Sequence, residues 1–308
     1  MKGGNSVDQS SSSCILKAMR AQIRPVDEHR LDREAGAIIY PVIARRSRGL
    51  SVGINLYPDR KVCGFDCPYC EVFPFETNLR FSLEAMERGL RNLASSGDRS
   101  FTADSVKDLS FSGNGEPTLH PDFVSALDLA ARLRKELFPT AKLVLITNGT
   151  GLLDPNLAAA LEKAARGEKA GFCEPGQNLE VWLKIDAGTE DWYRSINRSA
   201  IPFDALKQAI GDFSRRAPYI IQSMICKIEG KTPPEEEVAA WEAGIRGLVT
   251  ASAKNPGAGP RAVQLYGKAR PAAEDPLAEP VTEAYLLERS RSLRKALEPY
   301  QVPIEVYP

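Results

Sequence analysis

Hydrophobic residues along this chain fall into two patterns, short continuous apolar runs and longer stretches with an apolar residue every three or four positions. The first pattern predicts buried strands, and the second predicts helices with one apolar face. Lys142–Thr147 (KLVLIT) is the clearest strand. Ser82–Leu93 predicts a helix that begins after Ser82, because serine is a favoured N-cap residue. The two patterns alternate from about residue 50 onward.

This alternation predicts an α/β fold. Strands are expected at Ser51–Tyr57, Asp108–Ser112, Lys142–Thr147, Leu179–Ile185, Tyr219–Ile228, Ala262–Leu265 and Ile304–Tyr307. Helices are expected at Ser82–Leu93, Asp122–Leu137, Asn156–Arg166, Glu235–Ser252 and Thr282–Leu297, with further helical segments before Arg215. About six βα units in series imply a parallel sheet with right-handed crossovers. The pattern leaves two arrangements open, an open partial barrel and a doubly wound sheet, and both place function at the carboxyl ends of the strands.

The chain is expected to have three parts. Residues 1–35 form an N-terminal extension that is rich in Gly and Ser at its start and partly disordered, residues 36–267 form the core domain, and residues 268–308 add a loop, a helix and a strand that pack on the core. The first residues lack the apolar segment of a signal peptide, and no apolar run approaches the ~18 residues of a membrane span. We therefore expect no membrane partner and a cytoplasmic location.

Composition narrows the choice of function. Apolar residues make up 43% of the chain, and 40 basic residues balance 40 acidic ones, so overall charge does not favour nucleic acid or an anionic membrane. Arg45, Arg46 and Arg48 form a local basic cluster, which we interpret as a solvated face, with phosphate contact as the alternative. Only two histidines are present, which excludes a site built from several imidazoles.

Three of the six cysteines lie within eight residues. Cys63, Cys67 and Cys70 have the spacing C-x3-C-x2-C and follow the first predicted strand of the series. Thiolates are the preferred ligands of iron–sulfur clusters, and three of them on a four-iron cluster would leave one iron open. The alternative is a structural zinc site, which normally needs four ligands, and no fourth ligand lies nearby in the sequence.

This loop resembles the cluster-binding loop of the radical S-adenosylmethionine (SAM) superfamily. Gly53-Ile54-Asn55-Leu56 before it and Tyr69 inside it are part of the resemblance. The resemblance implies an open partial (βα)6 barrel, a [4Fe–4S] cluster on the three cysteines, and SAM as cofactor. It also implies reductive cleavage of SAM to a 5′-deoxyadenosyl radical, which takes hydrogen from a substrate. An electron donor such as flavodoxin or ferredoxin would be a partner.

Segments at the ends of later strands extend the resemblance. They imply SAM contacts by Tyr69, Ser112, Gly113, Asn114, Gly115, Glu116, Asn148, Lys184, Asp186 and Gln264. Glu116 and the backbone around Gly113 would hold the SAM amino group, and Tyr69 would lie beside the adenine. Alternatives from the residues alone stay open: Asn148 as a turn residue, and Lys184 with Asp186 as a self-satisfied ion pair.

The sequences of these motifs resemble those of the iron–sulfur oxidoreductase group related to wyosine synthases, which modify a guanosine in tRNA. Those enzymes hold a second cluster on three cysteines upstream, whereas here the only upstream cysteine is Cys14. The substrate class therefore stays open between a small molecule, tRNA and a protein. Two further possibilities are an activating enzyme that makes a radical on a partner protein, and a non-catalytic iron–sulfur or zinc-binding module.

Overall fold

One sheet runs through the whole molecule in the computed structural model, which describes residues 37–72, 74–97, 101–102, 104–270, 272 and 277–308. Its strands are β1 (Ile39–Ala44), β2 (Gly49–Ile54), β3 (Val106–Phe111), β4 (Lys142–Thr147), β5 (Leu179–Lys184), β6 (Pro218–Ile228), β7 (Gly259–Gly267), β8 (Ala278–Pro280) and β9 (Ile304–Tyr307). The β1 and β2 strands form an antiparallel hairpin, and from β2 to β7 and on to β9 all neighbours are parallel. The short β8 pairs with the end of β6.

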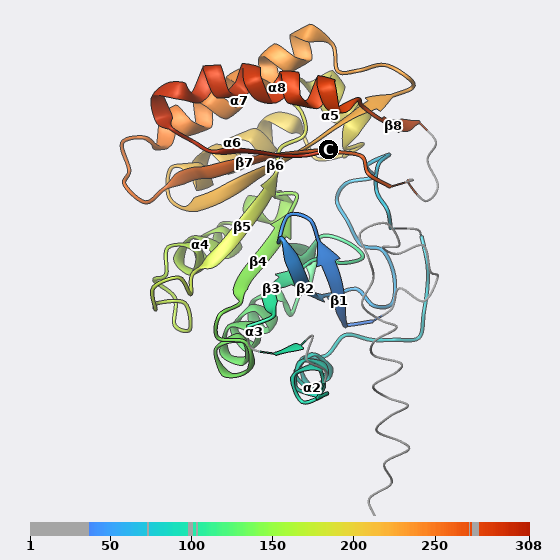
Figure 1. Cartoon of the computed structure of the whole chain (residues 1–308), viewed down its shortest axis with the longest axis vertical. Helices are drawn as coiled ribbons and strands as arrows, with labels where there is room; N and C mark the ends of the chain where they lie inside the picture. The colour runs from blue at the N-terminus through green and yellow to red at the C-terminus, as the bar shows by residue number, and fades with distance from the viewer. Residues whose placement is uncertain (1–36, 73, 98–100, 103, 271, 273–276) are drawn as a thin grey trace, which may run out of the picture.

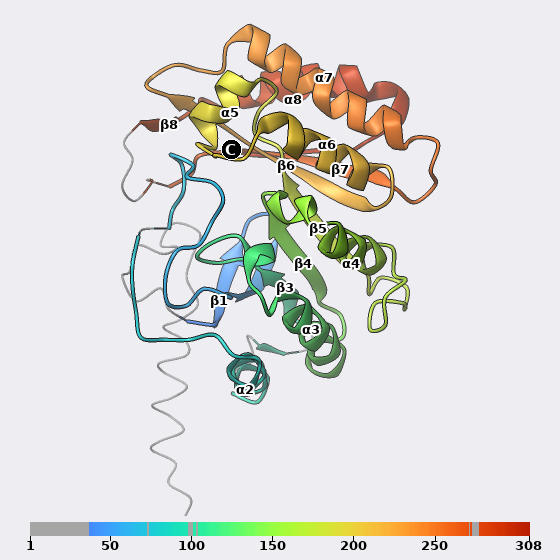
Figure 2. The ribbon, with the colours of Figure 1, turned by 180° about the vertical axis from the view of Figure 1, so that it is seen from behind.

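Helices connect the parallel strands. They are α2 (Leu83–Ala94), α3 (Phe123–Leu137), α4 (Pro155–Ala165), α5 (Glu190–Ile196), α6 (Phe203–Ser214), α7 (Glu235–Ser252) and α8 (Glu283–Leu297). In Figure 1 the strands fan from β1 and β2 in the lower half to β6 and β7 in the upper half, where α7 and α8 cover them. Figure 2 shows α3, α4 and α6 along the outside of the same sheet.

The strand order decides between the two arrangements that the sequence left open. The order β1-β2-β3-β4-β5-β6-β7-β9 is the order of the strands in the chain. A doubly wound sheet would reverse its order at a switch point and carry helices on both faces. With no reversal, each right-handed crossover places its helix on the same face, and the twisted sheet curls around the other face. The open partial barrel is therefore confirmed.

Alternation along the strands gives this sheet an apolar outer face and an inner face that mixes polar and apolar side chains. Leu109 on β3, Leu143 on β4 and Leu183 on β5 are fully buried in the core under the helices. The intervening positions Ser110 and Lys184 line the interior of the curled sheet. Buried apolar area on the outer face supplies the main driving force for packing the helices, and it leaves the inner face free for chemistry.

The predicted elements are largely present, with shifted ends. Lys142–Thr147 and Glu235–Ser252 have the predicted bounds, and Ser82 is the N-cap of α2, its side chain accepting from the N–H of Ala85. The sequence prediction of Ser51–Tyr57 as a strand was wrong at both ends, since β2 is Gly49–Ile54. The β1 strand was not predicted.

Two further predictions concern the N-terminal extension and membrane-spanning segments. The N-terminal extension 1–35 lies outside the described residues. Within the part of the chain that the structure describes, none of the helices combines the length and the apolar character needed to cross a membrane.

Candidate functional site

A cavity of about 320 Å³ lies in the interior of the curled sheet, and the cysteine loop forms part of its wall. The loop between β2 and α2 carries Cys63, Cys67 and Cys70, and all three line this cavity. Residues at or beyond the carboxyl ends of β3, β4, β5 and β7 line it too: Ser112, Gly113, Gly115, Glu116, Asn148, Lys184 and Tyr266. The segments that the resemblance linked to SAM therefore meet the cysteines in one place.

The cysteine loop is fastened to the segment after β3 by backbone hydrogen bonds. Val62 donates to the carbonyl of Asn114 at 3.2 Å, and Glu116 donates to the carbonyl of Val62 at 2.8 Å. Gly115 lies at this crossing, and a Cβ atom there would be 1.9 Å from the Val62 oxygen. Gly113 has a φ of 142° and is packed against Asn55. These two glycines thus allow two chain segments to approach each other, which a side chain would prevent.

Three N–H groups point at the cysteine sulfurs. The Phe65 backbone N–H donates to Cys63 Sγ at 3.4 Å, and Asn148 Nδ2 donates to the same sulfur at 3.5 Å. Asn197 Nδ2 donates to Cys67 Sγ at 3.6 Å. Such N–H···S hydrogen bonds stabilise negative sulfur and tune the potential of an iron–sulfur cluster.

The thiols lie in a poorly hydrated setting. Although Cys63 opens to the cavity, the surrounding protein raises its pKa to about 11 through desolvation. Burial likewise raises the pKa of Cys67 to about 12, although Lys184 opposes the shift. A thiolate at this site therefore needs a positive charge beside it, and a bound metal provides one.

The donor set fits an iron–sulfur cluster better than a single ion. Among the described residues, no three His, Cys, Asp or Glu side chains converge closely enough to hold one metal ion. The cysteines of a four-iron cluster each bind a different iron, so their sulfurs are farther apart than the four ligands of a zinc ion. Three thiols on one loop that open to one cavity, two of them met by N–H donors, fit such a cluster.

Glu116 joins the ends of two strands through its side chain, which is buried with only 2% of the residue exposed. Its Oε1 accepts from the backbone and hydroxyl of Thr118 and from Thr147 Oγ1, the last at 2.7 Å. Its Oε2 accepts from the backbone N–H of Asn148 at 2.7 Å. Burial raises the pKa of Glu116, while these hydrogen bonds oppose the rise. The carboxylate therefore positions Asn148, whose amide reaches Cys63.

Lys184 and Asp186 are paired beside Tyr69. Lys184 Nζ is 3.5 Å from Asp186 Oδ2 and donates to Tyr266 Oη at 2.5 Å. Tyr69 Oη donates to the same Asp186 oxygen at 2.5 Å, and Asn197 Nδ2 donates to it at 3.1 Å. Burial alone would lower the pKa of Lys184, but Asp186 raises it overall, so the lysine stays charged. The self-satisfied pair considered from the sequence is present.

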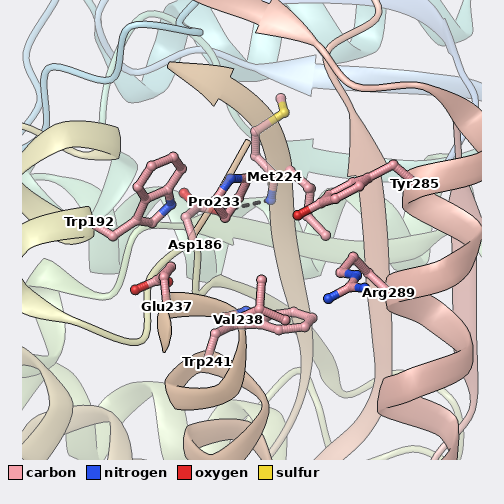
Figure 3. A pocket seen from close by; sticks show the side chains of 10 residues that line it. Asp186, Trp192, Met224, Pro233, Glu237, Val238, Trp241, Tyr285 and Arg289 are labelled. Atoms are coloured by element: carbon pink, nitrogen blue, oxygen red, sulfur yellow. Dashed lines mark hydrogen bonds between the residues drawn. The ribbon is translucent and has the colours of Figure 1, made fainter. Parts of the chain in front are cut away.

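Asp186 is not among the residues that line the main cavity, and Figure 3 shows it in the wall of another pocket. The aspartate lies at a second, smaller pocket of about 20 Å³ between α5, α7 and α8, lined also by Trp241 and Arg289. Its Oδ1 accepts from the backbone N–H of Met224 at 2.9 Å. This pocket has room for about one water molecule. With both oxygens bonded to protein groups, Asp186 orients Lys184, Tyr69 and Asn197 around the cysteine loop.

Other predicted contacts occupy different positions. Asn114 is buried outside the cavity wall, and its Nδ2 donates to the carbonyl of Tyr57. Gln264 also lies behind the wall, where it accepts from Gln222 Nε2 at 2.8 Å. Tyr69, Ser112, Gly113, Gly115, Glu116, Asn148 and Lys184 do line the cavity. Their contacts with SAM stay predictions.

Sequence reasoning missed two residues of this site. Asn197, in the turn after α5, gave no signal in the sequence. The interpretation of the arginine cluster as a solvated face is wrong for Arg46, which is half-buried and lines the cavity; Arg45 lines the cavity too but is exposed, and Arg48 is exposed and does not line it. The turn between β1 and β2 carries Arg46 inward, and the missed strand β1 was the signal that could have placed it.

Comparison with known structures supports this architecture. The chain matches a radical SAM methyltransferase from Sphaerobacter thermophilus with a TM-score of 0.51 and 14% identity, over 87% of this chain and 68% of that one. It matches Streptococcus suis SuiB bound to S-adenosylmethionine with a TM-score of 0.55 and 13% identity, over 85% of this chain and 52% of that one. The chain has the fold of these two proteins.

Sequence comparison adds less. No family model matches the chain. Two curated proteins from two strains of Helicobacter pylori, each named UPF0026 protein, are 28% identical over 131 residues, which is 40% of this chain. The match spans 38% of the length of each relative. The predicted relation to wyosine synthases is not shown by either kind of comparison.

Proposed function

We propose that this protein is a radical SAM enzyme that holds a [4Fe–4S] cluster on Cys63, Cys67 and Cys70. The observation that carries the proposal is that all three cysteines line one cavity with the segments after β3, β4 and β5, inside a fold shared with a radical SAM methyltransferase. Bound there, the cluster would supply one electron to SAM, giving methionine and a 5′-deoxyadenosyl radical that abstracts hydrogen from a substrate.

The protein residues would position these partners. Asn148 and Asn197 donate to the sulfurs of Cys63 and Cys67, and Glu116 fixes the backbone of Asn148. Tyr69, held by Asp186, presents its ring to the cavity beside Lys184. A cytoplasmic location and an electron donor such as flavodoxin or ferredoxin are part of this proposal.

A small-molecule substrate suits this cavity better than a partner protein. An activating enzyme would be favoured by an apolar rim for protein docking. Here the lining beside the cysteines includes charged side chains, Glu71, Lys268 and Arg270, and Arg270 pairs with Glu71 at 2.5 Å. A charged rim remains hydrated, so it favours entry of a polar molecule. Nothing in the described part of the chain favours the tRNA substrate that the resemblance to wyosine synthases suggested.

The test is an anaerobic assay of 5′-deoxyadenosine. The protein is reconstituted with iron and sulfide and incubated with SAM and dithionite. We expect product from the wild type and none from a variant with Cys63, Cys67 and Cys70 changed to Ala. Cys173→Ala is the matched control, because Cys173 is exposed, lies outside the main cavity, and donates to the backbone carbonyl of Lys169 at 3.1 Å. Its product should equal that of the wild type.

Two results would contradict the proposal. A well-formed cluster with no measurable SAM binding would leave a non-catalytic iron–sulfur module. Zinc bound in preference to iron, with loss of zinc in the triple variant, would make the loop a structural metal site.

A further inference from the structure

Arg46 occupies the interior of the curled sheet. It lies in the turn between β1 and β2, and its guanidinium carbon is 4.8 Å from the ring centre of Tyr266 and 5.8 Å from that of Trp182. Among the described residues it donates one hydrogen bond, from Nη1 to Gln222 Oε1 at 2.9 Å. A guanidinium has five N–H donors, so most of its capacity remains for something else.

A layer of polar side chains holds Arg46 in this position. The register pairs Lys184 on β5 with Gln222 on β6, Gln222 with Gln264 on β7, and Gln264 with Glu305 on β9. Gln222 Nε2 donates to Gln264 Oε1 at 2.8 Å, and Gln264 Nε2 donates to Glu305 Oε2 at 3.0 Å. This chain of bonds turns the Gln222 oxygen toward Arg46 and fixes the guanidinium.

The carboxylates of the cavity wall are engaged elsewhere. Glu71 pairs with Arg270, and Glu116 accepts hydrogen bonds from Thr118, Thr147 and Asn148. Glu305 is bonded to Gln264, Tyr307 and Arg48. Within the described part of the chain, no carboxylate forms an ion pair with Arg46. A half-buried cation without a counter-charge creates a positive potential, which attracts an anion.

A second observation points to a ligand in the same cavity. Ser110 lines it from β3 and is 4% exposed, and among the described residues its hydroxyl has no hydrogen-bond partner. Buried hydroxyls are normally satisfied, so an orphaned one on a cavity wall indicates a place where a polar ligand or water completes it.

Arg46 enters the interior from the end of β2 opposite to the cysteine loop. It lies in the turn before β2, whereas the cysteine loop follows β2. Its guanidinium bonds to Gln222, which is in register with Lys184 and Gln264, two of the SAM contacts that we predict. An anion bound by Arg46 would therefore lie next to SAM in the same cavity.

We propose that Arg46 binds an anionic group, a carboxylate or a phosphate, on a small-molecule substrate. The inference rests on the proposed radical SAM function for the reaction that follows binding. The planar guanidinium can bind either group through two parallel hydrogen bonds. Tyr266 and Trp182 lie within cation–π distance of it and help to hold it in place for the ligand.

The test measures anion binding directly on the anaerobically reconstituted protein. Inorganic phosphate and acetate are titrated by calorimetry at constant ionic strength, with and without SAM. We expect saturable binding of one equivalent of at least one anion, and the tighter anion identifies the group. Arg46→Gln should weaken binding about tenfold or more. The matched control is Arg48→Gln, because the Arg48 side chain on the same turn is 75% exposed, and its affinity should stay within about twofold.

A second variant guards against misfolding. Arg46→Met keeps an apolar stem over both rings and removes the charge, so it should fold and lose the anion as Arg46→Gln does. No saturable binding by the wild type, or wild-type affinity in both Arg46 variants, would overturn the proposal. Competition between the anion and SAM would also overturn it, because Arg46 would then serve the SAM carboxylate. Failure to form 5′-deoxyadenosine would contradict the proposed function and leave these binding results intact.

Discussion

Replacing Gly115 by alanine tests how the cysteine loop is held. The added Cβ would lie 1.9 Å from the Val62 carbonyl oxygen, whereas ordinary contact begins at 3.4 Å, so the two segments must separate by about 1.5 Å (3.4 − 1.9). That movement would stretch the hydrogen bond from Glu116 N–H to the Val62 oxygen from 2.8 Å to about 4.3 Å, beyond any useful length. The bond from Val62 N–H to Asn114 would be lost with it.

Two buried hydrogen bonds lost in this way cost about 2–4 kcal/mol in free energy of unfolding. For a chain of this size we expect the melting temperature to fall by roughly 3–6 °C. Iron bound per folded molecule should fall as well, because the displaced loop carries Cys63. Both are measured by thermal unfolding and by iron analysis after reconstitution.

Gly247→Ala provides the matched control. Gly247 lies inside α7, is exposed, and would place a Cβ in open space. Alanine there should stabilise the protein by about 0.5–1 kcal/mol and leave iron content unchanged. If Gly115→Ala melts like the wild type and binds as much iron, the close crossing of these segments does not hold the loop, and the reasoning is refuted.

Two further changes probe buried polar groups. Glu116→Gln sets an amide N–H against a donor such as the Asn148 N–H, so the free energy of unfolding should fall by about 1–3 kcal/mol, and iron content should fall too. Glu237 is an equally buried carboxylate outside the main cavity, so Glu237→Gln should lose stability and keep its iron. Burial lowers the pKa of His120 below 6.5, and the neutral ring accepts at Nδ1 from the Asp122 N–H. The stability that the neutral ring contributes is therefore present above about pH 6.5 and is lost as the pH falls through the lowered pKa. Urea unfolding at pH 7.5 and 5.5 should therefore show a larger loss for the wild type than for His120→Gln, and parallel losses would exclude this role.

Periodicity predicted the parallel strands and their helices because burial of one face repeats in the sequence. It could not choose between a partial barrel and a doubly wound sheet, because both use the same βα units and differ only in which strands become neighbours. The order of neighbours follows from long-range packing. The β1 strand escaped detection for a local reason: it is six residues long, and it contains Pro41.

The same distinction between local signals and long-range packing applies to the candidate site. The spacing of Cys63, Cys67 and Cys70 indicates a shared ligand, and Glu116 and Asn148 each follow a predicted strand. Their meeting at one edge of the sheet could therefore be predicted. Which atoms these residues bond to could not be predicted. The partners of Gln264 depend on the register of β6 and β9, and the inward position of Arg46 depends on a hairpin turn.

The strand order also has a consequence for how the chain is assembled. Each strand from β2 to β7 pairs with the strand synthesised just before it, so every new βα unit finds its partner already formed. The contact between the first hairpin and the last strand forms later, because Arg48 and Glu305 are 257 positions apart in the sequence. That contact, with the Gln222–Gln264–Glu305 layer, forms only when β9 has been made. A nascent chain that lacks β9 should therefore have most of its sheet and an incomplete interior.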